Sequence, residues 1–94
     1  MKMLIHIHRM IRADSDIPGV IANLCSAAET TIVLEGAAIS SMRRLTGELE
    51  RLNARFRLCV EDAAERLPLQ GNAERIGPDG FSELISQTDH FLSF

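Results

Sequence analysis

The 94-residue chain has no tryptophan and no tyrosine, and aromatic residues make up only 4% of its composition. It also has no Ser/Thr-rich phosphate loop after its first apolar run, so both usual supports of a bound flavin are missing. Cysteine is scarce as well: Cys25 and Cys59 lie far apart and form no CxxC pair. Two cysteines at this spacing predict neither a disulfide framework nor a zinc site. We therefore expect no cofactor.

The chain also lacks a strong charge of one sign and any long apolar run. Its net charge of -3 gives no electrostatic reason to expect nucleic acid or an anionic membrane as a partner. His6, His8 and Arg9 interrupt the amino-terminal apolar segment before it reaches the length of a signal peptide or a membrane span. We therefore expect a cytoplasmic protein. The length predicts a single domain, residues 1–94, with one modest core.

What the chain does contain is an alternation of short strand-like runs and helix-like stripes. The expected strands are Lys2–His8, Thr30–Glu35, Phe56–Cys59, Ala73–Ile76 and His90–Phe94. The expected helices are Ile17–Ala28, Ile39–Leu52, Val60–Leu67 and Phe81–Thr88, with a turn at Gly77–Gly80. Such alternation is typical of βαβ units, and it predicts an α/β three-layer sandwich around a mostly parallel five-stranded sheet.

Cys59 is the first candidate for chemistry, because it closes an expected strand just before an expected helix. In open α/β sheets the carboxyl ends of the strands are where ligands gather, and the amides that begin a helix stabilise a thiolate. Glu61 and Asp62 act in the opposite direction, since a nearby carboxylate raises a thiol pKa. The alternative is a small buried residue without chemistry, which is also what we expect of Cys25 in the apolar face of its helix.

Basic and imidazole side chains follow the first expected strand. His6 and His8 have a His-x-His spacing that can bind a metal, but no third ligand stands in a defined relation to them, so a packed or hydrogen-bonded role is expected and no metal. His8, Arg9 and Arg12 would line a pocket at the strand ends and hold an anionic sulfur species beside Cys59. The alternative is a solvated basic loop.

Four segments together resemble the DsrE/DsrF-like family of small sulfur-oxidation and sulfur-relay proteins, over nearly the whole chain. They are the opening strand with His6, Gly36 after the second strand, Arg55–Cys59 as a strand that ends in cysteine, and Pro78–Leu84 as a late Pro-x-Gly-x-x-Glu-Leu-like segment. The resemblance implies a flavodoxin-like α/β fold, oligomeric assembly, and a cysteine that carries sulfur as a persulfide between partner proteins. Only Cys59 matches that cysteine.

Two functions from different classes follow. In the first, the protein is a sulfur-relay carrier that passes sulfane sulfur on Cys59 between a donor and an acceptor protein. In the second, it is a non-catalytic oligomeric module in which a pocket near His8, Gly36 and Cys59 binds a small ligand or nothing. A phosphorelay receiver is disfavoured, because no acidic residue ends the third expected strand.

Assembly is expected in either case, because so small a sandwich buries little surface by itself. Met10–Ile11 and Phe91–Phe94 are the expected interface residues, in a dimer, trimer or hexamer.

Overall fold

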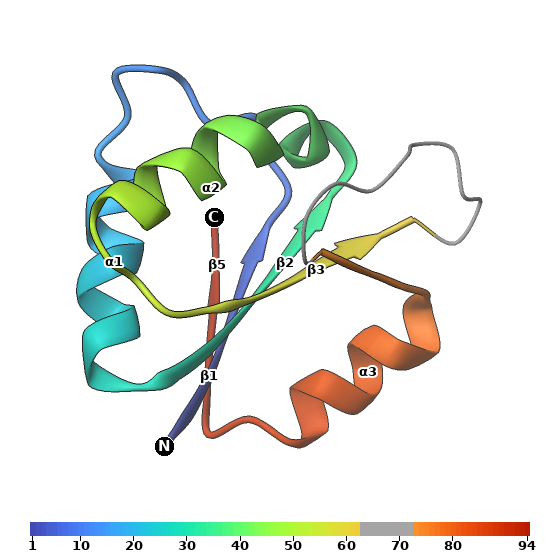
Figure 1. The fold of residues 1–94 in the computed structure, drawn as a ribbon. Helices are drawn as coiled ribbons and strands as arrows, with labels where there is room; N and C mark the ends of the chain where they lie inside the picture. The colour runs from blue at the N-terminus through green and yellow to red at the C-terminus, as the bar shows by residue number, and fades with distance from the viewer. Residues whose placement is uncertain (63–72) are drawn as a thin grey trace.

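Five parallel strands form the centre of the protein in a computed structural model that describes residues 1–62 and 73–94. The strands are β1 (Lys2–Ile7), β2 (Glu29–Glu35), β3 (Arg57–Glu61), β4 (Glu74–Ile76) and β5 (His90–Ser93), and their order in the sheet is β4-β3-β2-β1-β5. The helices are α1 (Ile17–Ala27), α2 (Met42–Arg51) and α3 (Pro78–Ser86), with a 3-10 helix, η1 (Gly36–Ser41), before α2 (Figure 1). The α/β prediction is therefore confirmed.

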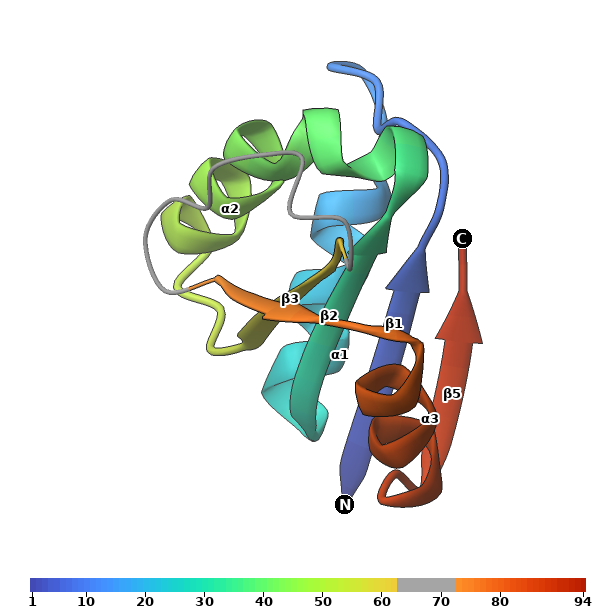
Figure 2. The same cartoon turned by 90° about the vertical axis from the view of Figure 1, so that its right-hand side faces the viewer.

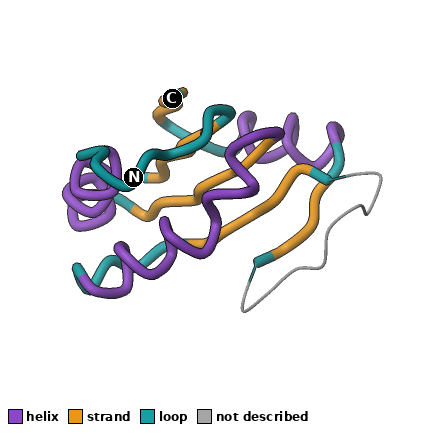
Figure 3. The backbone as a smooth tube through the Cα atoms, turned by 90° about the horizontal axis from the view of Figure 1, so that it is seen from above, coloured by secondary structure: helices purple, strands orange, loops and turns teal. Residues whose placement is uncertain are grey.

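The direction of each crossover explains how the helices are divided between the two faces of the sheet. The connections from β1 to β2 and from β2 to β3 step across the sheet in one direction, whereas the connection from β4 to β5 runs back past them to the far edge. Because parallel crossovers are right-handed, opposite directions place their helices on opposite faces. Accordingly, α1 and α2 lie on one side of the strands and α3 on the other (Figures 2 and 3).

The two faces bury different amounts of apolar side chain. Between the sheet and the α1/α2 pair lies the larger core, in which Ile5, Ile32 and Leu58 of the central strands pack against Ile21 and Leu45. On the α3 face, the fully buried residues are Leu4, Val33 and Cys59. Ile76, Phe81 and Leu84 cover them. Alternate residues of each strand supply the two cores, as expected for strands covered on both faces.

The expectation that β3 ends at Cys59 is wrong. The strand continues through Val60 to Glu61, with Leu34 opposite Val60 and Glu35 opposite Glu61 in β2. Val60 is fully buried and β-branched, and both properties favour a strand. The helix expected over Val60–Leu67 thus does not begin at Val60, and positions 63–67 lie outside the described residues.

The turn expected at Gly77–Gly80 is also wrong, because α3 begins there. Gly77 has extended backbone at the N-cap, and Pro78 occupies the first turn, where its missing N–H is not needed. Asp79 in the same turn places a negative charge at the positive end of the helix dipole. The glycine and proline residues that predicted a turn are therefore the residues that begin this helix.

The expected interface pair Met10–Ile11 is divided between solvent and core. Met10 is exposed, but Ile11 is only 2% exposed and belongs to the larger core. Its N–H donates to Ser41 Oγ at 2.8 Å, and its carbonyl accepts from Arg44 Nη1 at 3.0 Å. Ile11 therefore anchors the β1–α1 loop and is not available to a partner. None of the described helices has the length and apolar character needed to cross a membrane.

Candidate functional site

Three polar side chains gather at the carboxyl end of the central strands on the α3 face: His6 of β1, Glu35 of β2 and Glu61 of β3. We call them the His6–Glu35–Glu61 cluster. Nε2 of His6 lies 2.7 Å from Oε2 of Glu35, and Glu61 stands directly opposite Glu35 in the β2–β3 register. This edge of a parallel sheet is where α/β proteins build their binding sites.

Strand alternation places these side chains together. In β1, Met3, Ile5 and Ile7 enter the larger core, so Leu4 and His6 point to the other face. Gly36, directly after Glu35, has φ of 59°, a left-handed conformation that favours glycine and turns the chain into η1. Gly36, which was predicted as a pocket residue, lies directly after Glu35 in the chain, and its role here is to shape the backbone.

The cluster is partly shielded from water, and its carboxyl groups repel each other. The side chain of His6 is 14% exposed and that of Glu35 is 43% exposed. Burial raises the pKa of Glu61, and the Glu35 carboxyl raises it further through its charge and a hydrogen bond, while His6 lowers it. Glu61 therefore holds a proton to a higher pH than an ordinary glutamate does, and the protonated form donates to Glu35.

Aromatic rings surround the imidazole. Phe81 of α3 meets the His6 ring in an edge-to-face arrangement, with centroids 4.8 Å apart. The rings of His8 and Phe91 lie 5.6 Å and 6.3 Å from it. The cluster thus combines polar side chains at the strand ends with aromatic rings from α3 and β5, and both kinds of group occur in small-ligand sites.

The hydrogen bond to Glu35 also determines which ring nitrogen of His6 remains available to a ligand. The Glu35 carboxylate accepts from Nε2–H of His6, so Nδ1 is the ring nitrogen left for a ligand, as an acceptor in the neutral imidazole and as a donor in the imidazolium. Within residues 1–62 and 73–94 no side chain is hydrogen-bonded to Nδ1. Nor does any group of three or more His, Cys, Asp or Glu in these ranges have the arrangement of a metal site. Within the cluster, the Glu35 carboxylate is therefore the group that can accept from a ligand's hydrogen-bond donors.

Cys59 does not join this cluster. It lies two residues before Glu61 in the middle of β3, and it is 0% exposed beneath Phe81 and Leu84 of α3. Burial raises the pKa of its thiol, the charge of Arg57 lowers it, and Glu74 raises it. The other thiol, Cys25 of α1, is partly exposed, and burial raises its pKa too.

The other predicted pocket residues lie elsewhere. Arg9 and Arg12 line a separate cavity of about 570 Å³ at the α1 side of β1, away from Cys59. His8 is exposed at the end of β1, beside His6. The single pocket expected around Cys59 is therefore split into an imidazole–carboxylate cluster on one face and an arginine-lined cavity on the other.

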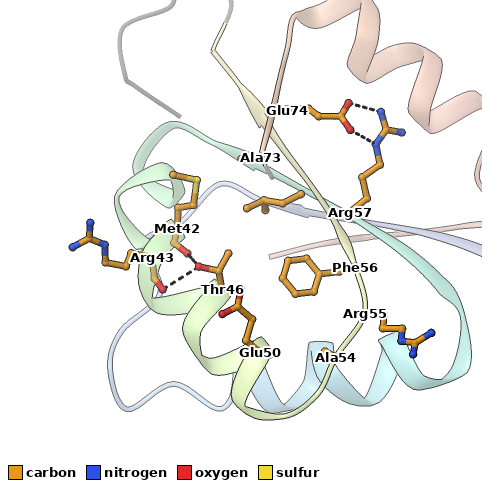
Figure 4. A pocket seen from close by; sticks show the side chains of 11 residues that line it. Met42, Arg43, Thr46, Glu50, Ala54, Arg55, Phe56, Arg57, Ala73 and Glu74 are labelled. Atoms are coloured by element: carbon orange, nitrogen blue, oxygen red, sulfur yellow. Dashed lines mark hydrogen bonds and ion pairs between the residues drawn. The ribbon is translucent and has the colours of Figure 1, made fainter. Parts of the chain in front are cut away.

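Another cavity, of about 730 Å³, opens between α2 and the β3–β4 edge (Figure 4). At its rim Arg57 and Glu74 form a two-point ion pair, with Nη2–Oε2 at 2.7 Å and Nε–Oε1 at 3.1 Å. These two charges already neutralise each other, so they give the cavity no net attraction for a charged ligand. The pair joins β3 to β4, and we interpret it as structural.

Glu35 and Glu61 are the site residues that sequence reasoning missed. Both are acids at the end of an apolar run, a signal that is visible in the sequence. The error in the end of β3 concealed it, because Glu61 was placed in a helix, where it would not face Glu35.

Comparison with known proteins supports the fold. No protein-family model matches the chain, and no curated protein matches it in sequence. Among solved structures, the ychN protein from E. coli matches over 100% of both chains with a TM-score of 0.70 and 12% sequence identity. That protein has a DsrE-like fold, so the fold implied by the resemblance is confirmed. At this identity the likeness shows the fold alone.

Proposed function

We propose that the protein is a non-catalytic, oligomeric binding module of DsrE-like fold whose His6–Glu35–Glu61 cluster binds a small organic amine. The observation that carries the proposal is the 2.7 Å contact between His6 and Glu35, with Glu61 next to it in register, at the carboxyl edge of the sheet. The carboxyl oxygens of Glu35 and Glu61 accept hydrogen bonds, and Glu35 supplies negative charge. The nearby rings of Phe81 and Phe91 suit the apolar body of an ammonium ligand.

The test is an NMR titration of the backbone amides with benzylamine, and with benzyl alcohol as the neutral ligand of similar shape. We expect benzylamine to shift the amides of His6, Glu35 and Glu61 and to bind more tightly than the alcohol. Glu35→Gln removes the charge and should weaken benzylamine about tenfold, since hydrogen bonds to charged groups are the strong ones. Glu50→Gln, an exposed site on α2, is the matched control. Equal binding by wild type and Glu35→Gln would rule the site out.

We further propose that copies of the chain assemble through the β5 edge. All four residues of β5 are exposed, including Phe91 at 44%, and an exposed apolar edge strand favours pairing. Phe94 packs against the larger core, so Phe91 and Leu92, not Phe94, supply the apolar contact. Light scattering after size-exclusion chromatography at micromolar concentration should give a multiple of the chain mass. A monomer would contradict this.

Sulfur relay on Cys59 is the second candidate, and one observation favours it. Among the described residues, Phe81 and Leu84 of α3 and Ile76 of β4 cover the thiol. Because α3 has no fully buried residue, a displacement of this helix would bring Cys59 closer to solvent. The thiolate would attack the outer sulfur of a donor protein's persulfide, form Cys-S-SH and release the donor thiolate. An acceptor thiolate would then attack that outer sulfur and release the Cys59 thiolate.

Thiol labelling separates the two candidates. The folded geometry predicts that Cys25 reacts before Cys59 near neutral pH, because Cys25 is partly exposed and Cys59 is buried. Mass spectrometry of the labelled Cys25→Ser variant gives the reaction rate of Cys59 alone, and the Cys59→Ser variant gives the rate of Cys25 alone. A carrier would show the reverse order, and a one-sulfur mass gain on Cys59 after incubation with polysulfide.

A further inference from the structure

The cavity on the α1 side of β1 differs from the amine site in its charge. Apolar side chains line much of its surface, among them Ile7, Ile17 and Phe94, and the two basic residues in its lining are Arg9 and Arg12. Its volume of about 570 Å³ lies within the range of small-molecule sites. An apolar hollow that also carries two guanidinium groups is suited to an amphipathic anion.

The loop that carries both arginines is fixed in place. Ile11, between them, is buried, and its backbone N–H and carbonyl are hydrogen-bonded to Ser41 and Arg44 at the start of α2. After Arg12 the chain closes a turn, with Ser15 N–H donating to the Arg12 carbonyl at 3.1 Å. Both guanidinium groups therefore extend from an anchored backbone, which lowers the entropy lost when they bind a ligand.

The positive charge of the cavity is only partly neutralised by the residues that line it. In the described part of the chain neither Arg9 nor Arg12 forms an ion pair, whereas Arg51 and Arg57 each pair with a glutamate. Asp14 also lines the cavity and offsets one of the two positive charges. The lining side chains keep one net positive charge. The first turn of α1, which begins at Ile17, adds the positive end of the helix dipole, and Asp16 at the N-cap offsets part of it.

We infer that this cavity is a second binding site, for a small organic anion with an apolar body. The arginines bind the anionic head, since a guanidinium matches a carboxylate with two parallel hydrogen bonds. Ile7, Ile17 and Phe94 contact the apolar part. The site lies on the opposite face of the sheet from the His6–Glu35–Glu61 cluster, so it does not depend on the proposed amine site.

The experiment titrates the full chain with hexanoate, and with hexanamide as the neutral ligand of the same length, followed by backbone-amide NMR. Hexanoate should shift the amides of Arg9, Arg12 and Ile17 in a saturable way and bind at least tenfold more tightly than hexanamide. Arg9→Gln combined with Arg12→Gln should weaken hexanoate about tenfold or more. Arg55→Gln, an exposed arginine at the other end of the sheet, is the matched control and should leave binding unchanged.

Two results would overturn the inference. One is equal affinity for hexanoate and hexanamide, which would mean that the cavity selects apolar groups without regard to charge. The other is hexanoate binding that is absent, or unchanged in the double variant. Both arginines are exposed, so the variants should keep the thermal unfolding midpoint of the wild type, which verifies that a loss of binding is local.

Discussion

The two faces of the sheet differ in how firmly they are covered. On one face, α1 and α2 each contribute buried residues, Pro18 and Ile21 from α1 and Leu45 and Leu49 from α2. On the other face, α3 contributes none and covers the sheet with partly buried Phe81 and Leu84. The polar cluster and the more buried thiol both lie on the thinly covered face. The α1/α2 face therefore supplies most of the stability, and the α3 face leaves room for polar side chains at the sheet edge.

The largest expected effect compares the same substitution on the two faces. Leu45→Ala removes a fully buried side chain of α2, and we expect a loss of about 3 kcal/mol in the free energy of unfolding. Leu84→Ala in α3 should cost only about 1 kcal/mol, because the side chain is partly exposed and its site can relax. Urea unfolding of both variants measures the difference. Equal losses would mean that α3 is as firmly packed as α2.

The firmly covered face was also the easier one to predict from sequence. The stripe of α1 and the apolar runs of β1 and β2 have clear periods, so these elements were found close to their observed bounds. The end of β3 was not predicted correctly, because a short apolar run followed by acids fits a strand or the start of a helix equally well. Pairing with β2 decides between the two, and this pairing joins residues that lie far apart in the sequence.

The same limit applies to the candidate site. His6 was found because a histidine in an apolar strand is conspicuous in the sequence. Its partnership with Glu35 depends on β1 and β2 being neighbours, and the Glu35–Glu61 pair depends on the exact β2–β3 register. Arg9 and Arg12 were expected to line a pocket beside Cys59, and they line a cavity on the other face instead. Their separation from Cys59 follows from which face each side chain occupies, and a one-residue change of register reverses that face.

A smaller effect compares two glycines, Gly36 at the start of η1 and Gly47 within α2. Gly36 has φ of 59° and open space around the position of a Cβ atom, so Gly36→Ala would cost about 1–2 kcal/mol through backbone strain alone. Gly47 lies within α2 and also has open space, so Gly47→Ala should stabilise the protein by about 0.5–1 kcal/mol. Thermal unfolding should show shifts of opposite sign. Shifts of the same sign would contradict the conformations assigned to these two positions.

The smallest effect concerns the polar edge of the thinly covered face, and it depends on pH. The pKa of Glu61 is raised in the folded state, first by burial and then by Glu35, so the folded protein binds this proton more tightly than the unfolded chain does. That contribution to stability is complete below the unfolded pKa of about 4.3 and is lost as the pH rises through the raised pKa. Glu61→Gln keeps the neutral form at every pH. It should match the wild type near pH 4 and exceed it by about 0.5 kcal/mol at pH 8, where two carboxylates face each other.

Urea unfolding at the two pH values tests this, with Glu50→Gln on α2 as the control for removing one negative charge from the chain. The control should show no such change with pH, because Glu50 is exposed and has no carboxyl group opposite it in a strand register. A Glu61→Gln variant that is less stable than the wild type at pH 8 would show that attraction to His6 outweighs repulsion from Glu35. The cluster would then be organised around the imidazole as a cation, and the amine proposed as its ligand would meet a positive charge.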